Sequence, residues 1–229
     1  MYNRAMNTDP TAKTVLCYGD SNTWGQTPDK TGRRRPANVR WTGVLQEKLG
    51  DRYAVIEEGL SSRTTDLDYA KKPGRNGRTY LEPCLDSHAP LDVVILMLGT
   101  NDFKIEFDRS VTEIAQAIQG LITLIQEKTA KYNGKSAQIM LVSPILVDGN
   151  APRMKEWYAA HYDQSSVKKS HEMAGLLQKL AENTGCHFVD AAQVATAGDD
   201  GIHFDEASHR ALGDFLAQQI KSLLEDAVV

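Results

Sequence analysis

Short apolar runs alternate with longer amphipathic segments along most of the chain. We expect five β-strands at the apolar runs, over residues 14–18, 53–57, 92–98, 137–142 and 186–190. Helical patterns follow over residues 39–49, 110–132, 165–184 and 206–227. Asn133-Gly134 and Gly185 are helix-stop signals at the ends of the second and third of these segments.

This alternation predicts the fold class. Strands separated by long helices form a parallel sheet that is covered on both faces, because each crossover is right-handed. We therefore expect an α/β fold, a three-layer α/β/α sandwich of flavodoxin type around a central five-stranded parallel sheet. Residues 14–229 form a single domain in this interpretation, and residues 1–13 form a flexible N-terminal extension.

Two segments lack a clear pattern, residues 70–90 and 146–163, and both are predicted to be irregular. The second contains Trp157, Tyr158 and Tyr162. It either borders a substrate entrance, forms an oligomer contact or is an ordinary surface excursion.

Composition narrows the class of protein. A length of 229 residues, with 41% hydrophobic and 24% charged residues, suits one globular domain with a real core. The net charge of −4 argues against a nucleic-acid partner. No apolar stretch reaches the roughly 18 residues of a membrane span. The polar first 13 residues lack a secretory signal and the three cysteines form no close pairs, so we expect a cytoplasmic protein without disulfides.

Polar clusters follow the predicted strands. They are Gly19-Asp20-Ser21-Asn22-Thr23, residues 59–65, Gly99-Thr100-Asn101-Asp102 and Asp200-Gly201-Ile202-His203. Because the carboxyl ends of parallel strands share one edge of a sheet, these clusters are expected to converge where ligands bind.

The converging residue types suit acyl transfer. Ser21 stands where a nucleophile would point into the crevice, and a serine hydroxyl needs a base to react at neutral pH. Among six histidines His203 is the best candidate, because it precedes the last helix and Asp200 stands three residues before it. A tight turn would bring that carboxylate to the imidazole Nδ1. His209, in the last helix, is expected to be structural.

An acyl transfer site also needs donors for an oxyanion. The Asn101 side-chain amide and the backbone N–H groups of Ser21 and the second-strand loop are candidates. The alternative for Asn101-Asp102 is a helix cap or turn. Asp20 either holds the nucleophile turn or caps the following segment, and Trp24 either lines an acyl pocket or packs in the core.

These motifs resemble the SGNH hydrolase (GDSL-type esterase) superfamily over residues 14–224. The four clusters occur in the order of that superfamily. Residues 19–25, 39–45, 57–65 and 200–204 are similar to its arylesterase/acyltransferase group. Two positions depart from the common pattern, because Asn22 replaces the leucine of the GDSL motif and Ser62 replaces a frequent glycine.

The resemblance implies a serine esterase that hydrolyses short acyl (acetyl or aryl) esters through an acyl-enzyme. It implies Ser21 as nucleophile, His203 as general base and acid, and Asp200 as its orienting partner. The oxyanion hole would consist of the Ser21 and Ser62 N–H groups and the Asn101 side chain. Alcohols or peroxide are implied as further acyl acceptors, and a homo-oligomer, an octamer in several members, as the assembly.

We expect Asp20, Asn22 and Trp24 to border the substrate pocket. No metal and no cofactor are expected, because nucleotide-binding and metal-ligating motifs are missing from the sequence. The expected partner is a small-molecule ester, with no nucleic acid and no membrane. Two alternatives stay open: a carbohydrate deacetylase acting on acetylated xylo-oligosaccharides, and a binding module without catalysis.

Overall fold

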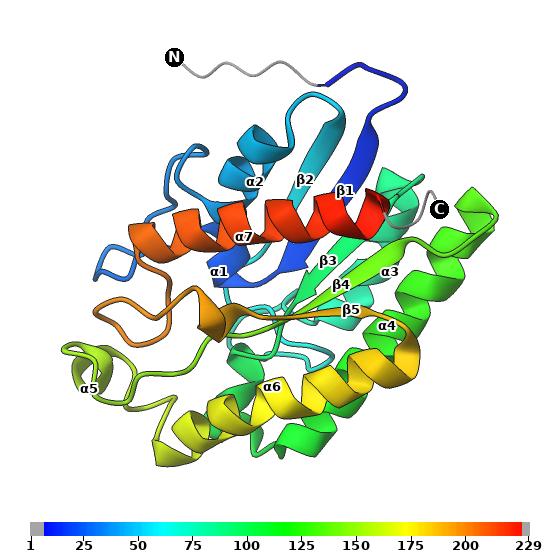
Figure 1. Ribbon diagram of the computed structural model, residues 1–229. Coiled ribbons are helices and arrows are strands. Elements are labelled where there is room, and N and C mark those ends of the chain that lie inside the picture. Colours follow the sequence, from blue (N-terminus) through cyan, green and yellow to red (C-terminus); the bar gives the residue numbers. More distant parts are fainter. Residues whose placement is uncertain (1–6, 226–229) are drawn as a thin grey trace.

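Figure 1 shows the computed structural model of the protein, which describes residues 7–225. Its centre is one sheet of five parallel strands in the order β2-β1-β3-β4-β5. The strands are β1 (Lys13–Gly19), β2 (Tyr53–Gly59), β3 (Val93–Met97), β4 (Gln138–Ser143) and β5 (His187–Asp190). The predicted five-stranded parallel sheet is thus confirmed, and its strand order is the one found in flavodoxin-like folds.

Helices cover both faces of the sheet and complete the predicted three layers (Figure 1). The helices are α1 (Ser21–Trp24), α2 (Trp41–Leu49), α3 (Gly77–His88), α4 (Val111–Asn133), α5 (Met154–Trp157), α6 (Gln164–Thr184) and α7 (Glu206–Glu225). α2 and α7 pack together over one face, where their apolar side chains meet β1, β3 and β4. α3, α4 and α6 cover the other face with a second apolar core.

Local sequence explains why α4 is so well delimited. The Ser110 hydroxyl accepts from the Glu113 N–H, and the Glu113 carboxylate accepts from the Ser110 N–H, so a capping box starts the helix. Gly134 ends it in the left-handed region at φ 72°. Ile114, Ile118 and other apolar residues at helical spacing are buried against the sheet.

The prediction that residues 70–90 are irregular is wrong for the second half of the segment, which forms α3. Asn76 caps this helix by accepting from the Thr79 N–H. Leu81, Cys84 and Leu85 lie on its buried face. The helical pattern is hard to recognise in the sequence, because glycines, prolines and charged residues surround this short apolar stripe. In the second segment, 146–163, the four-residue helix α5 is the regular element.

The ends of the described chain limit what can be said of two predictions. Residues 1–6 of the expected extension and residues 226–227 of the expected last helix lie outside the described residues. The Asn7 side chain donates to the backbone oxygens of Asp51, at 2.8 Å, and Tyr53, at 3.1 Å. Among residues 7–225 no helix is long and apolar enough to cross a membrane.

The register of the sheet aligns the loops that carry the site. Gly19 at the end of β1 pairs with Gly59 of β2 on one side and with Met97 of β3 on the other. The three loops therefore start at the same edge. A side chain at position 59 would meet the Trp24 backbone nitrogen at 2.1 Å, so only glycine lets α1 rest directly on β2.

Replacing this glycine tests that close approach. We expect Gly59→Ala to lower the free energy of unfolding by about 1–3 kcal/mol, because α1 must move to admit a methyl group. Gly175→Ala is the matched control. No atom lies within 4 Å of the methyl group that it would add to α6, so it should stabilise the protein by about 0.5–1 kcal/mol. Urea unfolding measures both, and equal stability of the two variants would contradict the packing.

Candidate active site

Ser21 lies in a tight turn between β1 and α1. Asp20 is the N-cap of α1, and its side chain accepts from the Asn22 N–H at 2.9 Å. Burial raises the pKa of Asp20, against the lowering effect of this hydrogen bond. Asp20 therefore both caps the segment and holds the turn, the two alternatives left open by the sequence.

The structure brings Ser21, His203 and Asp200 together, although 182 positions separate the first two. The Ser21 Oγ lies 3.0 Å from His203 Nε2, and His203 Nδ1 lies 2.6 Å from Asp200 Oδ2. Because a carboxylate only accepts, Nδ1 carries the proton and Nε2 is left to accept from the hydroxyl. All three residues are buried. This is the geometry that a base-activated nucleophile requires.

The turn that presents His203 is built by Asp200 itself. Asp200 Oδ1 accepts from the backbone N–H groups of Ile202, at 3.0 Å, and His203, at 2.9 Å. Gly201 supplies the left-handed backbone conformation, at φ 79°. One carboxyl group thus closes the turn with one oxygen and orients the imidazole with the other, as the three-residue spacing predicts.

The Asn22 side chain joins the two turns. Its amide nitrogen donates to the Ile202 carbonyl at 3.1 Å, and its oxygen accepts from the Phe204 N–H at 2.9 Å. Both bonds are buried, and together they bracket His203. A leucine, the residue that names the GDSL motif, can make neither bond. The sequence did not disclose this role, because the partners are backbone groups about 180 residues away.

The three candidate oxyanion donors belong to Ser21, Ser62 and Asn101, which line the same cavity. Within residues 7–225, neither the Ser21 N–H nor the Ser62 N–H donates to another protein group. The Asn101 Nδ2 donates to the Arg63 carbonyl at 3.1 Å, which leaves its second hydrogen available. Ser62 has φ 67°, in the region that favours glycine. This conformation explains why a glycine would suit the position.

Buried polar contacts hold the loops that carry these donors. The Asp102 carboxylate accepts from the Thr65 N–H at 3.0 Å and pairs with the Arg109 guanidinium at 3.1 Å. Burial raises the pKa of Asp102 to about 6, despite the bonds from Thr65. The Arg63 guanidinium lies over the Tyr18 ring and donates to the Gly19 carbonyl. The loops after β1, β2 and β3 are therefore bound to one another.

A cavity of about 200 Å³ opens above the Ser21 hydroxyl. Its lining includes Ser21, Gln26, Ser62, Tyr69, Lys72, Asn101, Lys104, Trp157, Tyr158, His161, Tyr162, Ile202 and His203. Trp157, Tyr158 and Tyr162 come from the segment 146–163. Their position agrees with the first alternative for that segment, a border of a substrate entrance.

The structure does not bring Asp20, Asn22 and Trp24 to the wall of this cavity. Asp20 and Asn22 are buried on either side of Ser21 in sequence, and their side chains bind backbone groups. Trp24 is half-buried beneath the Arg34 guanidinium, which lies 5.5 Å from the centre of its ring. Asn22 follows Ser21 directly in sequence, but its side chain binds the turn before α7 instead of lining the cavity.

Sequence reasoning missed Tyr69, Lys72, Lys104 and His161, which all line the cavity. Lys104 follows Asn101 by only three positions, so its closeness to a recognised motif could have indicated that it lies near the site. Tyr69 and Lys72 lie near or inside a segment without a pattern, and no sequence signal placed them. His209, expected to be structural, is buried and accepts from the Trp41 N–H at 3.2 Å. Burial lowers its pKa to about 3.

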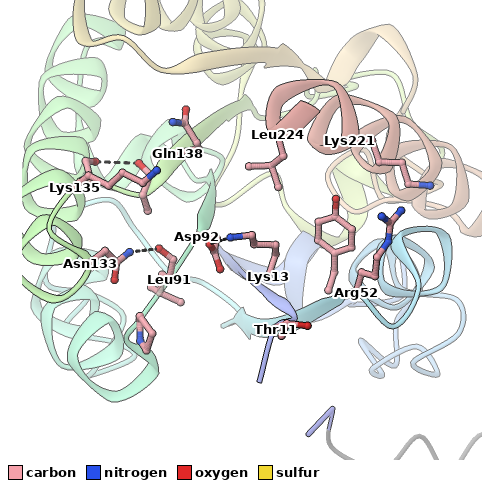
Figure 2. Close-up of a pocket in the computed structure, with 14 residues that line it drawn as sticks. Thr11, Lys13, Arg52, Leu91, Asp92, Asn133, Lys135, Gln138, Lys221 and Leu224 are labelled. Atoms are coloured by element: carbon pink, nitrogen blue, oxygen red, sulfur yellow. Dashed lines mark hydrogen bonds and ion pairs between the residues drawn. The ribbon is translucent and has the colours of Figure 1, made fainter. Parts of the chain in front are cut away.

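A second, larger hollow of about 830 Å³ lies at the opposite edge of the sheet (Figure 2). Its lining includes residues where strands begin, such as Lys13, Tyr53 and Gln138. Lys13 pairs there with Asp92 at 2.9 Å, as Figure 2 shows. None of the predicted site residues lines this hollow.

Among the described residues one group could offer three metal ligands, Glu58, Cys84 and His88, whose ligand atoms lie within 4.8 Å of one another. Glu58 already pairs with His88 at 2.9 Å. Burial raises the pKa of the Cys84 thiol to about 12, which disfavours the thiolate that a metal binds.

The known proteins that this chain resembles are esterases and acylhydrolases. The profile of the GDSL-like Lipase/Acylhydrolase family matches residues 17–211. The aryl esterase of M. smegmatis in its inhibitor-bound form is 42% identical, with a TM-score of 0.85 over 93% of this chain and 100% of that one. A carbohydrate acetylesterase from Sinorhizobium meliloti is 38% identical, with a TM-score of 0.82 over 92% and 99%.

A more distant relative is larger. The acetylxylan esterase of Xylanibacter ruminicola is 27% identical over 222 residues, which cover 90% of this chain. The match spans only 43% of that protein's length.

The Asn22 bridge can be tested by stability. We expect Asn22→Ala to lower the free energy of unfolding by about 1–3 kcal/mol, because the buried Ile202 carbonyl and Phe204 N–H lose their partners. Asn150→Ala, at an exposed position, is the matched control and should change stability by less than about 0.5 kcal/mol. Urea unfolding measures both. An Asn22→Ala protein as stable as the control would show that the bridge carries no net stabilisation.

Proposed function

Because the chain belongs to the GDSL-like lipase/acylhydrolase family and is a carboxylic ester hydrolase, we propose that Ser21, His203 and Asp200 are its catalytic triad. The observation that carries this proposal is the unbroken series of contacts from hydroxyl to imidazole to carboxylate, at 3.0 and 2.6 Å. The series ends in a cavity large enough for a short acyl ester.

The first half of the reaction acylates the serine. The Ser21 Oγ attacks the ester carbonyl carbon while His203 Nε2 takes the hydroxyl proton, and Asp200 stabilises the imidazolium that forms. The negative charge that develops on the carbonyl oxygen is stabilised by the N–H groups of Ser21 and Ser62 and the Asn101 amide. As the tetrahedral intermediate collapses, His203 gives its proton to the leaving alcohol and an acyl-enzyme remains.

The second half releases the acyl group. His203 Nε2 takes a proton from water, whose oxygen attacks the acyl carbon, and then returns a proton to Ser21. An alcohol or peroxide in place of water would yield a new ester or a peracid. The aromatic wall of Trp157, Tyr158 and Tyr162 favours such transfer, because it offers an organic acceptor an apolar surface.

The small cavity supports short acyl groups as substrates. At about 200 Å³ it is below the usual range for a drug-sized ligand, so an acetyl ester fits better than a long-chain one. The likeness to a carbohydrate acetylesterase supports a second candidate, the deacetylation of sugars. Rates on acetylated xylo-oligosaccharides and on aryl acetates distinguish the two substrate classes.

Removing the nucleophile tests the mechanism. We expect Ser21→Ala to lower kcat for p-nitrophenyl acetate by at least about 1000-fold, because no other group can form the acyl-enzyme. Ser87→Ala, an exposed serine on α3, is the matched control and should keep full activity. A fluorophosphonate should add its mass to wild-type protein and not to Ser21→Ala. Unchanged turnover in Ser21→Ala would refute the assignment of the nucleophile.

The oxyanion donors can be separated by type. Asn101→Ala removes a side-chain donor, and we expect kcat for p-nitrophenyl acetate to fall about 100- to 1000-fold. Ser62→Gly keeps the backbone N–H and suits φ 67°, so kcat should stay within about threefold. Steady-state kinetics with circular dichroism of each variant measures the difference. Equal losses in both variants would contradict the role given to the Ser62 backbone.

A further inference from the structure

Two ammonium groups line the cavity beside the proposed nucleophile. Lys104 lies three residues after Asn101 and only 7% of its surface is exposed. Lys72 comes from the segment between β2 and α3. Both side chains border the same hollow as Ser21 and His203. Lys104 is buried, whereas Lys72 is exposed. A buried cation is costly unless an anion pairs with it, so the role of Lys104 depends on which anion it meets.

Lys104 has no anionic partner in contact. Within residues 7–225 no carboxylate comes within ion-pairing distance of its Nζ, which lies 4.8 Å from the centre of the Tyr69 ring. Burial lowers the pKa of Lys104 to about 8, although the negative charges of Glu106, Asp20 and Asp102 act to raise it. A desolvated ammonium without a contact partner binds an anion more strongly than an exposed one.

The acids nearest to Lys104 are bound elsewhere. The Glu106 carboxylate accepts from the Tyr69 hydroxyl at 2.9 Å and contacts His161 Nδ1 at 2.9 Å. Asp102 is bound by Thr65 and Arg109. Both carboxylates thus have hydrogen-bond partners other than Lys104, and no carboxylate is among the residues that line the cavity.

Lys72 is held in place by the oxyanion loop. Its Nζ donates to the Ser62 Oγ at 2.9 Å, and an ammonium carries two further hydrogens. This bond gives a reason for serine at a position whose φ favours glycine. It also fixes a second cation next to the residue whose N–H is proposed to bind the oxyanion.

We propose that the cavity is an anion subsite, in which Lys104 and Lys72 bind a carboxylate carried by the ester substrate. This inference rests on the proposed esterase function and specifies its substrate class as acidic short-chain esters. The aromatic side chains of Trp157 and Tyr158 cover the hydrocarbon part of such a substrate. The carboxylate can belong to the alcohol or to the acyl half of the ester, and the two halves are distinguished experimentally.

Matched pairs of substrates isolate the charge. For the alcohol half, the pair is 4-acetoxybenzoate and 4-acetoxybenzamide, and for the acyl half it is the p-nitrophenyl monoesters of glutaric acid and of glutaramic acid. Each pair differs only in a carboxylate against a carboxamide of similar size. We expect wild-type kcat/KM to be at least about tenfold higher for the acid in one pair, which identifies the half that carries the charge. A preference for the amide in both pairs would overturn the proposal.

Variants assign the preference to the lysines. Lys104→Met keeps the apolar stem, so the acid-to-amide ratio of kcat/KM should fall at least about tenfold. Lys104→Arg should retain most of the ratio, and Lys72→Met should lower it independently. Lys168→Met, on an exposed part of α6, is the control and should change nothing. Parallel losses on acid and amide in both methionine variants would show a structural role and refute the subsite.

Binding without turnover separates this inference from the proposed function. Ser21→Ala protein should bind 4-acetoxybenzoate, or the glutaric monoester, at least about tenfold more tightly than the matching amide by calorimetry. The difference should vanish in Ser21→Ala/Lys104→Met protein. If the anion binds selectively although wild-type protein hydrolyses no ester, the subsite stands and the esterase mechanism fails. If esters are hydrolysed without any selectivity for the acid, the esterase mechanism stands and the anion subsite fails.

Discussion

The site depends on the hydrogen bonds that join the turn after β1 to the turn before α7. Asn22 donates to the Ile202 carbonyl and accepts from the Phe204 N–H, and both bonds are buried. A buried polar group without a partner is costly, so these bonds allow only one arrangement of the two turns. The 3.0 Å contact between Ser21 and His203 follows from that arrangement. The residue that departs from the GDSL motif is therefore part of the frame that holds Ser21 beside His203.

The register of the sheet aligns the loops that carry the rest of the site. The glycines at the ends of β1 and β2 lie opposite each other, and each lacks the side chain that would separate α1 from the strands. The loops after β1, β2 and β3 therefore begin side by side at the same edge of the sheet. Asp102 and Arg63 bind these loops to one another through buried charged hydrogen bonds. The proposed oxyanion donors are therefore held in fixed positions by the protein itself, as electrostatic stabilisation of a transition state requires.

Positively charged side chains outnumber negatively charged ones in the lining of the cavity. Ammonium groups from Lys72 and Lys104 face it, while the nearby carboxylates of Glu106 and Asp102 are occupied by other side chains. Relatives include an aryl esterase and a carbohydrate acetylesterase of similar fold. The proposed triad alone therefore does not define a substrate, and the residues that line the cavity must do so. In the proposed subsite, the buried ammonium of Lys104 would discriminate between charged and neutral esters, because water screens its charge less than that of an exposed lysine.

Periodicity and motif spacing determined the parallel sheet, most of its helices, and the grouping of Ser21, Asn101, Asp200 and His203 at one edge. Those features follow from local patterns and from the rule that parallel strands end together. Tertiary structure alone decided that α3 forms, that Asn22 and Trp24 turn away from the crevice, and that Lys72 and Lys104 enter it. Each of these depends on partners distant in sequence, or on a short apolar stripe hidden among turn residues. A side chain's direction is set by what packs around it, and one sequence read alone does not contain that information.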